Sequence, residues 1–313
     1  MSKKIVILGG GTGTSTLVRG LKEFPVDISV VVSVCDDGSS TGKLREEFDI
    51  PAVGDLRKVL SALSDTEPLF ESLLEYRFNT SSDLNGHAVG NLLLAALCNI
   101  TGNMSDGIKS LSKVLNLKGK VLPLSEDNVV LMGIMNDGEK IEGEHNITET
   151  HKKIKKVFYK QEPVVSKDAI KAIKEADLII LSMGSVYTSI IPHLLCKEII
   201  NAIDSSDAKI MYVCNVMTQP GETDGFTASD HINLLNSYLG KRKIDTVITN
   251  SKKVSKKTQK IYETLEQKDL VKIDYDNLKN VSLIEDNYFI VEDNKIRHDA
   301  LKLAFSIFTE IFK

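Results

Sequence analysis

The chain has 313 residues, of which 42% are hydrophobic and 26% charged, an ordinary composition for a globular protein with a large core. Its formal net charge of -4 argues against a general nucleic-acid-binding protein, which would normally be basic. Four well-separated cysteines without a Cys-x-x-Cys pair argue against a zinc site or disulfide framework and fit a reduced cytoplasmic protein. The chain does not start like a signal peptide, and no apolar run approaches the length of a membrane span, so we expect no membrane insertion.

The first strand leads into a glycine-rich loop. An apolar strand, Lys4–Leu8, is followed by four glycines within residues 9–13 and by a helix over Thr14–Phe24. The loop is neither G-x-G-x-x-G, because threonine replaces the third glycine, nor a Walker A motif. It exposes backbone N–H groups at a helix N-terminus, which favours phosphate binding over a tight turn alone. The predicted contacts are Gly10, Gly11, Thr12, Gly13 and Thr14.

The second strand, Ile28–Cys35, ends in two adjacent carboxylates, Asp36 and Asp37, at the start of a polar loop that extends to Arg45. The carboxylates could hold a ribose or Mg²⁺, or could form only an Asx turn that caps the loop. Hydroxyl and cationic side chains follow, which could contact phosphate, although Lys43 and Arg45 could equally be ordinary surface cations. This second group of candidate contacts is Ser39, Ser40, Lys43, Arg45 and Arg57.

Short helices are predicted next, at Asp55–Leu63, Leu69–Phe78 and Asn91–Cys98. The last of these is almost entirely apolar on one face, so we expect it to be buried. His87 precedes it in a glycine-containing loop. A histidine there often only caps a helix, but the neighbouring glycines and Asn91 favour a ligand contact for both residues.

Residues from about 100 to 165 predict an antiparallel elaboration of one domain that spans residues 1–313, because no flexible linker borders it. A helix is expected at Met104–Leu115. Three short strands are expected at Lys120–Leu124, Asn128–Met135 and Lys140–Glu144. The lysine-rich stretches 152–156 and 252–260 are interpreted as solvated faces.

An alternation of strands and helices then returns. Strands are predicted at Asp177–Ser182 and Lys209–Asn215, and helices at Ile190–Ile203, Ala228–Leu239 and Ala300–Phe312. Edge strands could follow at Ile244–Thr249, Leu270–Ile273 and Tyr288–Val291. This order predicts a Rossmann-like α/β fold with a mostly parallel sheet and helices on both faces.

Two late strand-to-helix loops, residues 182–189 and 217–224, are rich in polar side chains and should lie at the same sheet edge as the earlier loops. Neither contains an evident nucleophile with its base, and no histidine pair has metal-ligand spacing, so Asp36 and Asp37 are the candidates for any chemistry. The predicted contacts in these loops are Ser185, Tyr187, Thr188, Thr218, Gln219, Glu222 and Thr223.

Several motifs in register resemble the bacterial gluconeogenesis factor family, which is related to the 2-phospho-L-lactate transferases of coenzyme F420 synthesis. The resemblance implies a cytoplasmic Rossmann-like protein that binds a UDP-sugar or similar nucleotide and acts in gluconeogenic growth, cell shape and wall synthesis. The related transferases move a phospholactyl group from a guanylyl donor to a deazaflavin with Mg²⁺. The motifs are residues 9–13, 36–38, 54–57, 86–92, 185–189 and 217–224.

One departure is Ser182-Met183, where similar proteins carry Gly-Pro, and the resemblance also makes Arg297 a diphosphate contact. We expect a non-catalytic nucleotide-sugar-binding regulatory protein, with a homodimer and a cell-wall synthesis protein as candidate partners. The alternative is a Mg²⁺-dependent phosphotransferase of the phospholactate type, which needs positioning and charge stabilisation more than a base. A dinucleotide-dependent oxidoreductase is the least supported reading, because the glycine spacing differs. No cofactor other than Mg²⁺ is implied.

Overall fold

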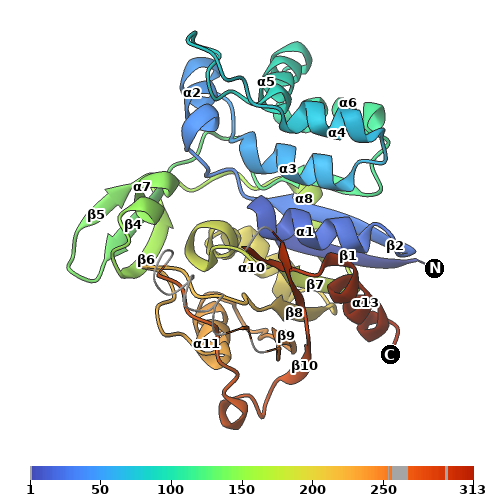
Figure 1. Ribbon diagram of the computed structural model, residues 1–313, viewed down its shortest axis with the longest axis vertical. Helices are drawn as coiled ribbons and strands as arrows, with labels where there is room; N and C mark the ends of the chain where they lie inside the picture. The colour runs from blue at the N-terminus through green and yellow to red at the C-terminus, as the bar shows by residue number, and fades with distance from the viewer. Residues whose placement is uncertain (1, 253, 256–266, 293–294) are drawn as a thin grey trace.

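The structure, a computed structural model, describes residues 2–252, 254–255, 267–292 and 295–313 (Figure 1). Within these residues, seven strands form one parallel sheet in the order β10-β9-β8-β7-β1-β2-β3. The strands are β1 (Lys3–Gly9), β2 (Val26–Val32), β3 (Lys120–Pro123), β7 (Leu178–Leu181), β8 (Lys209–Val213), β9 (Thr246–Asn250) and β10 (Ser282–Asp286).

The strand order reverses direction between β1 and β7. The chain runs from β1 outward through β2 and β3, and from β7 outward through β8 to β10 on the other side. Leu8 of β1 pairs with Leu181 of β7, so the loops that follow these two strands start side by side. Ligands of open α/β sheets bind in the crevice at such a switch point.

Helices cover both faces of the sheet (Figure 1). On one face, α1 (Gly11–Leu21) packs between α3 (Gly54–Leu63) and α13 (Ala300–Ile311). On the other face, α8 (Lys167–Lys174) packs against α10 (Lys197–Asp204). The central strands are buried on both sides, which explains why β7 reads Leu-Ile-Ile-Leu rather than as an alternating pattern.

Two groups of elements extend beyond the sheet (Figure 1). The first is helical: α2 (Ser39–Phe48), α4 (Pro68–Glu75), α5 (Val89–Thr101) and α6 (Met104–Val114). The second is an antiparallel sheet of β4 (Leu131–Met135), β5 (Lys140–Glu142) and β6 (Ile154–Tyr159), with α7 (Glu144–Glu149) beside it. A separate antiparallel ribbon joins β11 (Phe289–Glu292) to β12 (Lys295–His298).

The predicted mostly parallel sheet with helices on both faces is confirmed, but parts of the antiparallel elaboration were assigned wrongly. Residues 120–123 form β3, which pairs in parallel with β2 at one edge of the main sheet. The third strand of the antiparallel sheet is β6, which begins within the lysine-rich stretch 152–156 and keeps those lysines exposed. Most of the second stretch, 252–260, lies outside the described residues.

The single helix predicted over Ile190–Ile203 is divided. A π-helical turn (Val186–Ile190) leads into α9 (Ile191–Leu194), and an extended Cys196 separates α9 from α10. Pro192 explains the first break, because proline lacks the N–H group that would continue a preceding helix.

Three further predictions differ from the structure. The loop predicted to extend to Arg45 contains α2, which begins at Ser39. The proposed edge strand at Leu270–Ile273 makes only isolated bridges, and β10 forms the edge instead. The strand predicted at Tyr288–Val291 pairs with β12 and not with the main sheet. Whether residues 1–313 are one domain stays a prediction.

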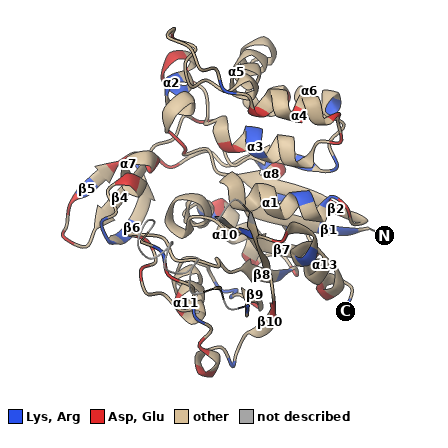
Figure 2. Cartoon of the chain, viewed as in Figure 1, with Lys and Arg blue, Asp and Glu red and all other residues tan. Residues whose placement is uncertain are grey.

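Positive and negative side chains are interspersed along the ribbon (Figure 2). No helix in the described ranges combines the length and apolarity required to cross a bilayer.

Candidate ligand-binding site

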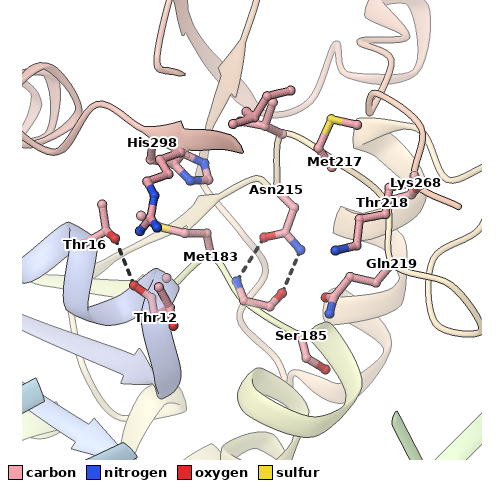
Figure 3. A pocket seen from close by; sticks show the side chains of 15 residues that line it. Thr12, Thr16, Met183, Ser185, Asn215, Met217, Thr218, Gln219, Lys268 and His298 are labelled. Atoms are coloured by element: carbon pink, nitrogen blue, oxygen red, sulfur yellow. Dashed lines mark hydrogen bonds between the residues drawn. The ribbon is translucent and has the colours of Figure 1, made fainter. Parts of the chain in front are cut away.

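The glycine-rich loop places the N-terminus of α1 at a cavity of about 420 Å³ (Figure 3). The N-cap is Gly10, which has an extended backbone and no side chain to cap the first N–H groups of α1. Thr12, Gly13 and Thr16 line the cavity from this helix. The positive end of the helix dipole therefore lies where an anion would be stabilised.

Gly13 is required for the close approach of two loops. A Cβ atom on Gly13 would lie 2.1 Å from the backbone oxygen of Met183, which follows β7. The buried Thr14 Oγ1 also donates a hydrogen bond to Ser182 Oγ at 3.1 Å. The loops after β1 and β7 therefore pack directly against each other beside the cavity.

Asn215, which follows β8, fixes the other side of the same crevice. Its Oδ1 accepts from Gly184 N at 3.0 Å, and its Nδ2 donates to Gly184 O at 2.7 Å (Figure 3). The amide side chain therefore satisfies both backbone groups of Gly184, as a neighbouring β-strand would. Of the predicted contact residues, those that line the cavity are Thr12, Gly13, Ser185, Thr218, Gln219 and Arg297.

Cationic and imidazole side chains complete the wall of the cavity. Arg297 and His298 of β12 line it together with Lys268. Burial lowers the pKa of His298 to about 4, so its ring is neutral at neutral pH. The buried Nε2 of this ring has no hydrogen-bond partner within the described residues.

Ser185 joins the loops after β7 and β8. Its Oγ donates to the carboxylate of the buried Glu222, with distances of 2.6 and 2.8 Å, and accepts from Thr188 N at 2.9 Å. Burial raises the pKa of Glu222. Tyr187 and Thr223 are also buried, and Thr223 Oγ1 accepts from Gln219 N at 2.9 Å. Four predicted contacts therefore hold the loops together and do not line the cavity: Tyr187, Thr188, Glu222 and Thr223.

An acidic cavity of about 180 Å³ also borders the glycine-rich loop. Gly11, Asp36, Asp55, Lys58 and Glu144 are among the residues that line it. Asp55 Oδ1 accepts from Lys58 Nζ at 3.0 Å. Asp55 also lies against the loop, because a Cβ atom on Gly10 would come within 2.4 Å of its Oδ2. Burial raises the pKa of Asp55, and burial together with neighbouring carboxylates raises that of Glu144 to about 7.

Replacement of Glu144 by glutamine should stabilise the protein more at pH 8 than at pH 5. The ordinary pKa of 4.5 is raised to about 7, so the folded state binds the proton more tightly and loses stability as pH rises between these values. The variant should gain on the order of 2 kcal/mol at pH 8, reduced by the partial exposure of this side chain, and little at pH 5. Urea unfolding at both pH values measures this. An equal change at both would contradict it.

Asp36 and Asp37 do not share one site. Asp36 lines the acidic cavity, and its Oδ1 accepts from Gly38 N at 3.0 Å, as in an Asx turn. Asp37 Oδ1 instead accepts from His145 N at 2.8 Å, at the start of α7. No group of three or more His, Cys, Asp or Glu side chains in the described structure is arranged to hold a metal. If Mg²⁺ binds, the chemistry of the oxygen donors favours Asp36 with Asp55.

A buried hydrogen-bonded chain connects four other predicted contacts. Arg57 Nε donates to Asn91 Oδ1 at 3.0 Å, and Asn91 Nδ2 donates to Ser40 Oγ at 3.2 Å. Ser40 Oγ lies 3.0 Å from His87 Nδ1. This series of hydrogen bonds joins α2, α3 and α5, so these residues stabilise the helical region. Of these four, His87 lines an open pocket, together with the exposed Lys43. Ser39 is exposed at the start of α2.

Arg45 is buried and connects three segments of the chain by hydrogen bonds. Its guanidinium donates to Asn128 Oδ1, to Cys35 O at 3.1 Å and to Asp36 O at 2.9 Å, and it also contacts Val129 O. These acceptors use all three nitrogens. Arg45 therefore joins α2 to the end of β2 and to the segment before β4.

Replacement of Asn215 by aspartate should weaken the crevice without removing the side chain. The carboxylate keeps the acceptor for Gly184 N but places an oxygen against Gly184 O, so the stability should fall by about 1–2 kcal/mol. Ligand affinity should fall at least about tenfold, which is about 1.4 kcal/mol. Chemical unfolding and calorimetric titration measure both effects. The exposed Asn136→Asp serves as the control, and equal behaviour of the two variants would contradict the assigned role.

The fold and the cavity define a Rossmann-like α/β protein whose candidate site lies at the topological switch point. The family described as 2-phospho-L-lactate transferase CofD matches residues 5–289. The chain belongs to this family.

The chain is similar over almost its whole length to proteins named gluconeogenesis factor. It is 47% identical to one from Bacillus subtilis, with 99% of this chain and 98% of the relative aligned. It is 45% identical to one from Halalkalibacterium halodurans, with 97% and 95% aligned. A crystal structure of a Bacillus halodurans protein has a TM-score of 0.95 and 44% identity, covering 98% of this chain and 100% of the other. The predicted family resemblance is confirmed.

Several residues around the two cavities did not appear among the predicted contacts. Asn215 ends a predicted strand and Asp55 begins a predicted helix, so a polar residue at each strand or helix boundary was the available signal. Lys268 and Glu144 stand in segments with no distinctive pattern, and only the fold brings them to the site.

Proposed function

We propose that this protein binds a nucleotide diphosphate sugar, such as a UDP-sugar, in the cavity formed by the loops after β1, β7 and β8. The observation that carries the proposal is the uncapped N-terminus of α1 at this cavity, which Arg297 and Lys268 also line. A diphosphate needs such a combination of backbone donors and cations. The cavity volume of about 420 Å³ lies in the range of small-molecule sites, roughly 300–1,000 Å³.

The remaining wall suits the polar parts of such a ligand. Gln219 offers a side-chain amide for a base or sugar, and the Thr218 hydroxyl, whose oxygen accepts from Asp269 N at 2.9 Å, can still donate. The family resemblance favours uridine over other bases. In the proposed complex, the diphosphate contacts the first turn of α1 and Arg297.

We infer a regulatory role without turnover, in the cytoplasm. The hydroxyl–carboxylate pair at this cavity, Ser185 with Glu222, already holds two loops together, which favours a structural use of both groups. The names of the relatives support a role in growth on gluconeogenic carbon sources. Control of cell shape and wall synthesis through a protein partner, with the chain acting as a homodimer, belongs to the same proposal.

Calorimetric titration tests the ligand class. The purified protein is titrated with UDP-N-acetylglucosamine, UDP-glucose, GDP and NAD, each with and without Mg²⁺, and the nucleotide is recovered for chromatography. The proposal expects a UDP-sugar to bind most tightly, independently of Mg²⁺, and to be recovered intact. Preference for GDP that requires Mg²⁺ would contradict it.

The second candidate is a Mg²⁺-dependent transferase of the phospholactate type. It is favoured by the family and by the acidic cavity beside the glycine-rich loop. Bound Mg²⁺ would neutralise phosphate charge, and Asp36 and Asp55 would hold it. Transfer should then fall at least about a hundredfold in Asp36→Asn, about 2.7 kcal/mol, whereas the exposed Asp83→Asn should be unaffected. Equal activity of the two variants would exclude the assigned metal position.

A further inference from the structure

A further cavity, of about 720 Å³, lies at the amino ends of β1, β2 and β3. The candidate nucleotide site uses the carboxyl ends of strands, so this cavity lies at the opposite end of the sheet from that site. The proposed function makes no use of it. Its volume is within the range of small-molecule sites.

The strand register defines the floor of this cavity. Lys4 pairs with Asp27, Val6 with Ser29, and Ser29 with Lys120. Residues paired in this way point to the same face of a parallel sheet. The five side chains therefore share one face, and Leu122, two residues beyond Lys120, lies on it as well.

Ser29 is a distinctive part of the floor. It interrupts the apolar run of β2 with a short side chain, and its hydroxyl has no hydrogen-bond partner within the described ranges. A valine or isoleucine at this position would fill part of the space. The walls are α6, which contributes the buried Ile108, and α8, which contributes the half-buried Ala172. Val6, Leu122, Ile108 and Ala172 therefore give the cavity an apolar lining, with the Ser29 hydroxyl on its floor.

The rim is positively charged. Five lysines and three carboxylates line the cavity. Glu175 pairs with Lys4 at 2.9 Å, and Asp168 lies 3.5 Å from Lys109. In the described structure, Lys113 and Lys120 have no carboxylate within 4.0 Å, and Asp27 has no lysine within that distance, so five lysines against three carboxylates leave an excess of two positive charges. An apolar interior with unpaired cations at its mouth is complementary to a small molecule that has an apolar body and an anionic head.

We propose that this cavity is a second binding site, specific for a small monocarboxylate with an aliphatic or aromatic body. The carboxylate lies at Lys113 and Lys120, and the body lies over Val6, Ser29 and Leu122 between α6 and α8. A cationic ligand of the same shape is repelled by the rim. A neutral one gains only the apolar burial and lacks the pairing with lysine.

Equilibrium dialysis and calorimetry with decanoate, decanol and decylammonium, each below its aggregation limit, test the proposal on the full chain. Decanoate should bind one molecule per chain, at least tenfold more tightly than either matched compound. Ala172→Phe, which fills the cavity from α8, should remove binding without changing the thermal unfolding temperature by more than a few degrees. Lys113→Gln with Lys120→Gln should weaken decanoate at least fivefold, and the neighbouring exposed Lys174→Gln should leave it unchanged.

Equal affinity for the three compounds would overturn the proposal, as would decanoate binding that survives Ala172→Phe. If Ala172→Phe unfolds the chain, Ser29→Leu provides the same obstruction from the floor. A third outcome would also overturn the proposal: the parent protein does not bind decanoate, and Ala172→Phe changes the oligomeric state measured by sedimentation. That result would indicate that a second copy of the chain occupies this face. The result is independent of nucleotide binding, because none of the three compounds is a nucleotide and none of the substituted residues lines the candidate nucleotide cavity.

Discussion

Replacement of Gly13 by alanine is expected to abolish nucleotide binding and to destabilise the protein. The added Cβ atom would lie 2.1 Å from Met183 O and 2.8 Å from Met183 C, and both are backbone atoms that cannot rotate away. The N-terminus of α1 must then separate from the loop after β7, which opens the crevice. We expect a loss of about 3 kcal/mol in the free energy of unfolding, typical of overpacking at a rigid contact, and an affinity at least about a hundredfold weaker.

Thermal or urea unfolding and calorimetric titration with UDP-N-acetylglucosamine measure both effects. Gly102→Ala is the control, because a Cβ atom there meets nothing within 4 Å and only its φ of +86° is unfavourable, which costs about 1 kcal/mol. Thr16→Phe, a change to a half-buried residue that lines the cavity, should block the ligand in a protein that still folds normally. Binding by Gly13→Ala as tight as that of the parent would contradict the described packing.

Replacement of Arg45 by alanine is expected to cause a large loss of stability with little direct effect on the nucleotide. Removal of the buried guanidinium leaves the backbone oxygens of Cys35, Asp36 and Val129 without this donor. Unsatisfied buried acceptors cost about 1–3 kcal/mol each, so a total of about 3–5 kcal/mol is expected. Arg45→Lys should recover part of this, because lysine keeps the charge but lacks the planar fork.

Lys43→Ala, two residues earlier on α2, is the matched control, because Lys43 is exposed and should change stability by less than about 0.5 kcal/mol. Denaturant unfolding of the three variants gives the comparison. Titration under conditions where each variant is folded then tests the ligand role. If Arg45→Ala keeps normal stability but loses nucleotide affinity, Arg45 contacts phosphate and the structural assignment is wrong.

The sequence allowed the central sheet and the glycine-rich loop to be predicted, because both depend on local patterns. Buried runs such as Ile5–Leu8 and Leu178–Leu181 are apolar on both faces, and a glycine cluster after a strand has few alternative explanations. Which strands pair with each other was harder to predict. Residues 120–123 are too short to show whether they pair with β2 or with the antiparallel sheet, and that choice depends on contacts far away in the chain.

The candidate site was predicted in outline rather than in detail. Sequence indicates that Arg45, Arg57 and Asn91 are polar residues near functional loops, but it does not show that folding buries them among their own partners. The sequence predicts phosphate contacts at Arg45 and Arg57, with a surface position as the alternative for Arg45. Both side chains are buried, which is rare for arginine. Conversely, Asn215 contacts Gly184, thirty-one residues away in the chain, and a pairing at that separation has no local signature.

A crystal structure of the protein with UDP-N-acetylglucosamine, grown without divalent metal, is the most direct test of the central claim. We expect the diphosphate to contact the backbone N–H groups of the first turn of α1 and the side chain of Arg297, within the cavity bordered by Gly184 and Asn215. Electron density for the intact nucleotide in the acidic cavity at Asp36 and Asp55, or at the opposite end of the sheet, would contradict it.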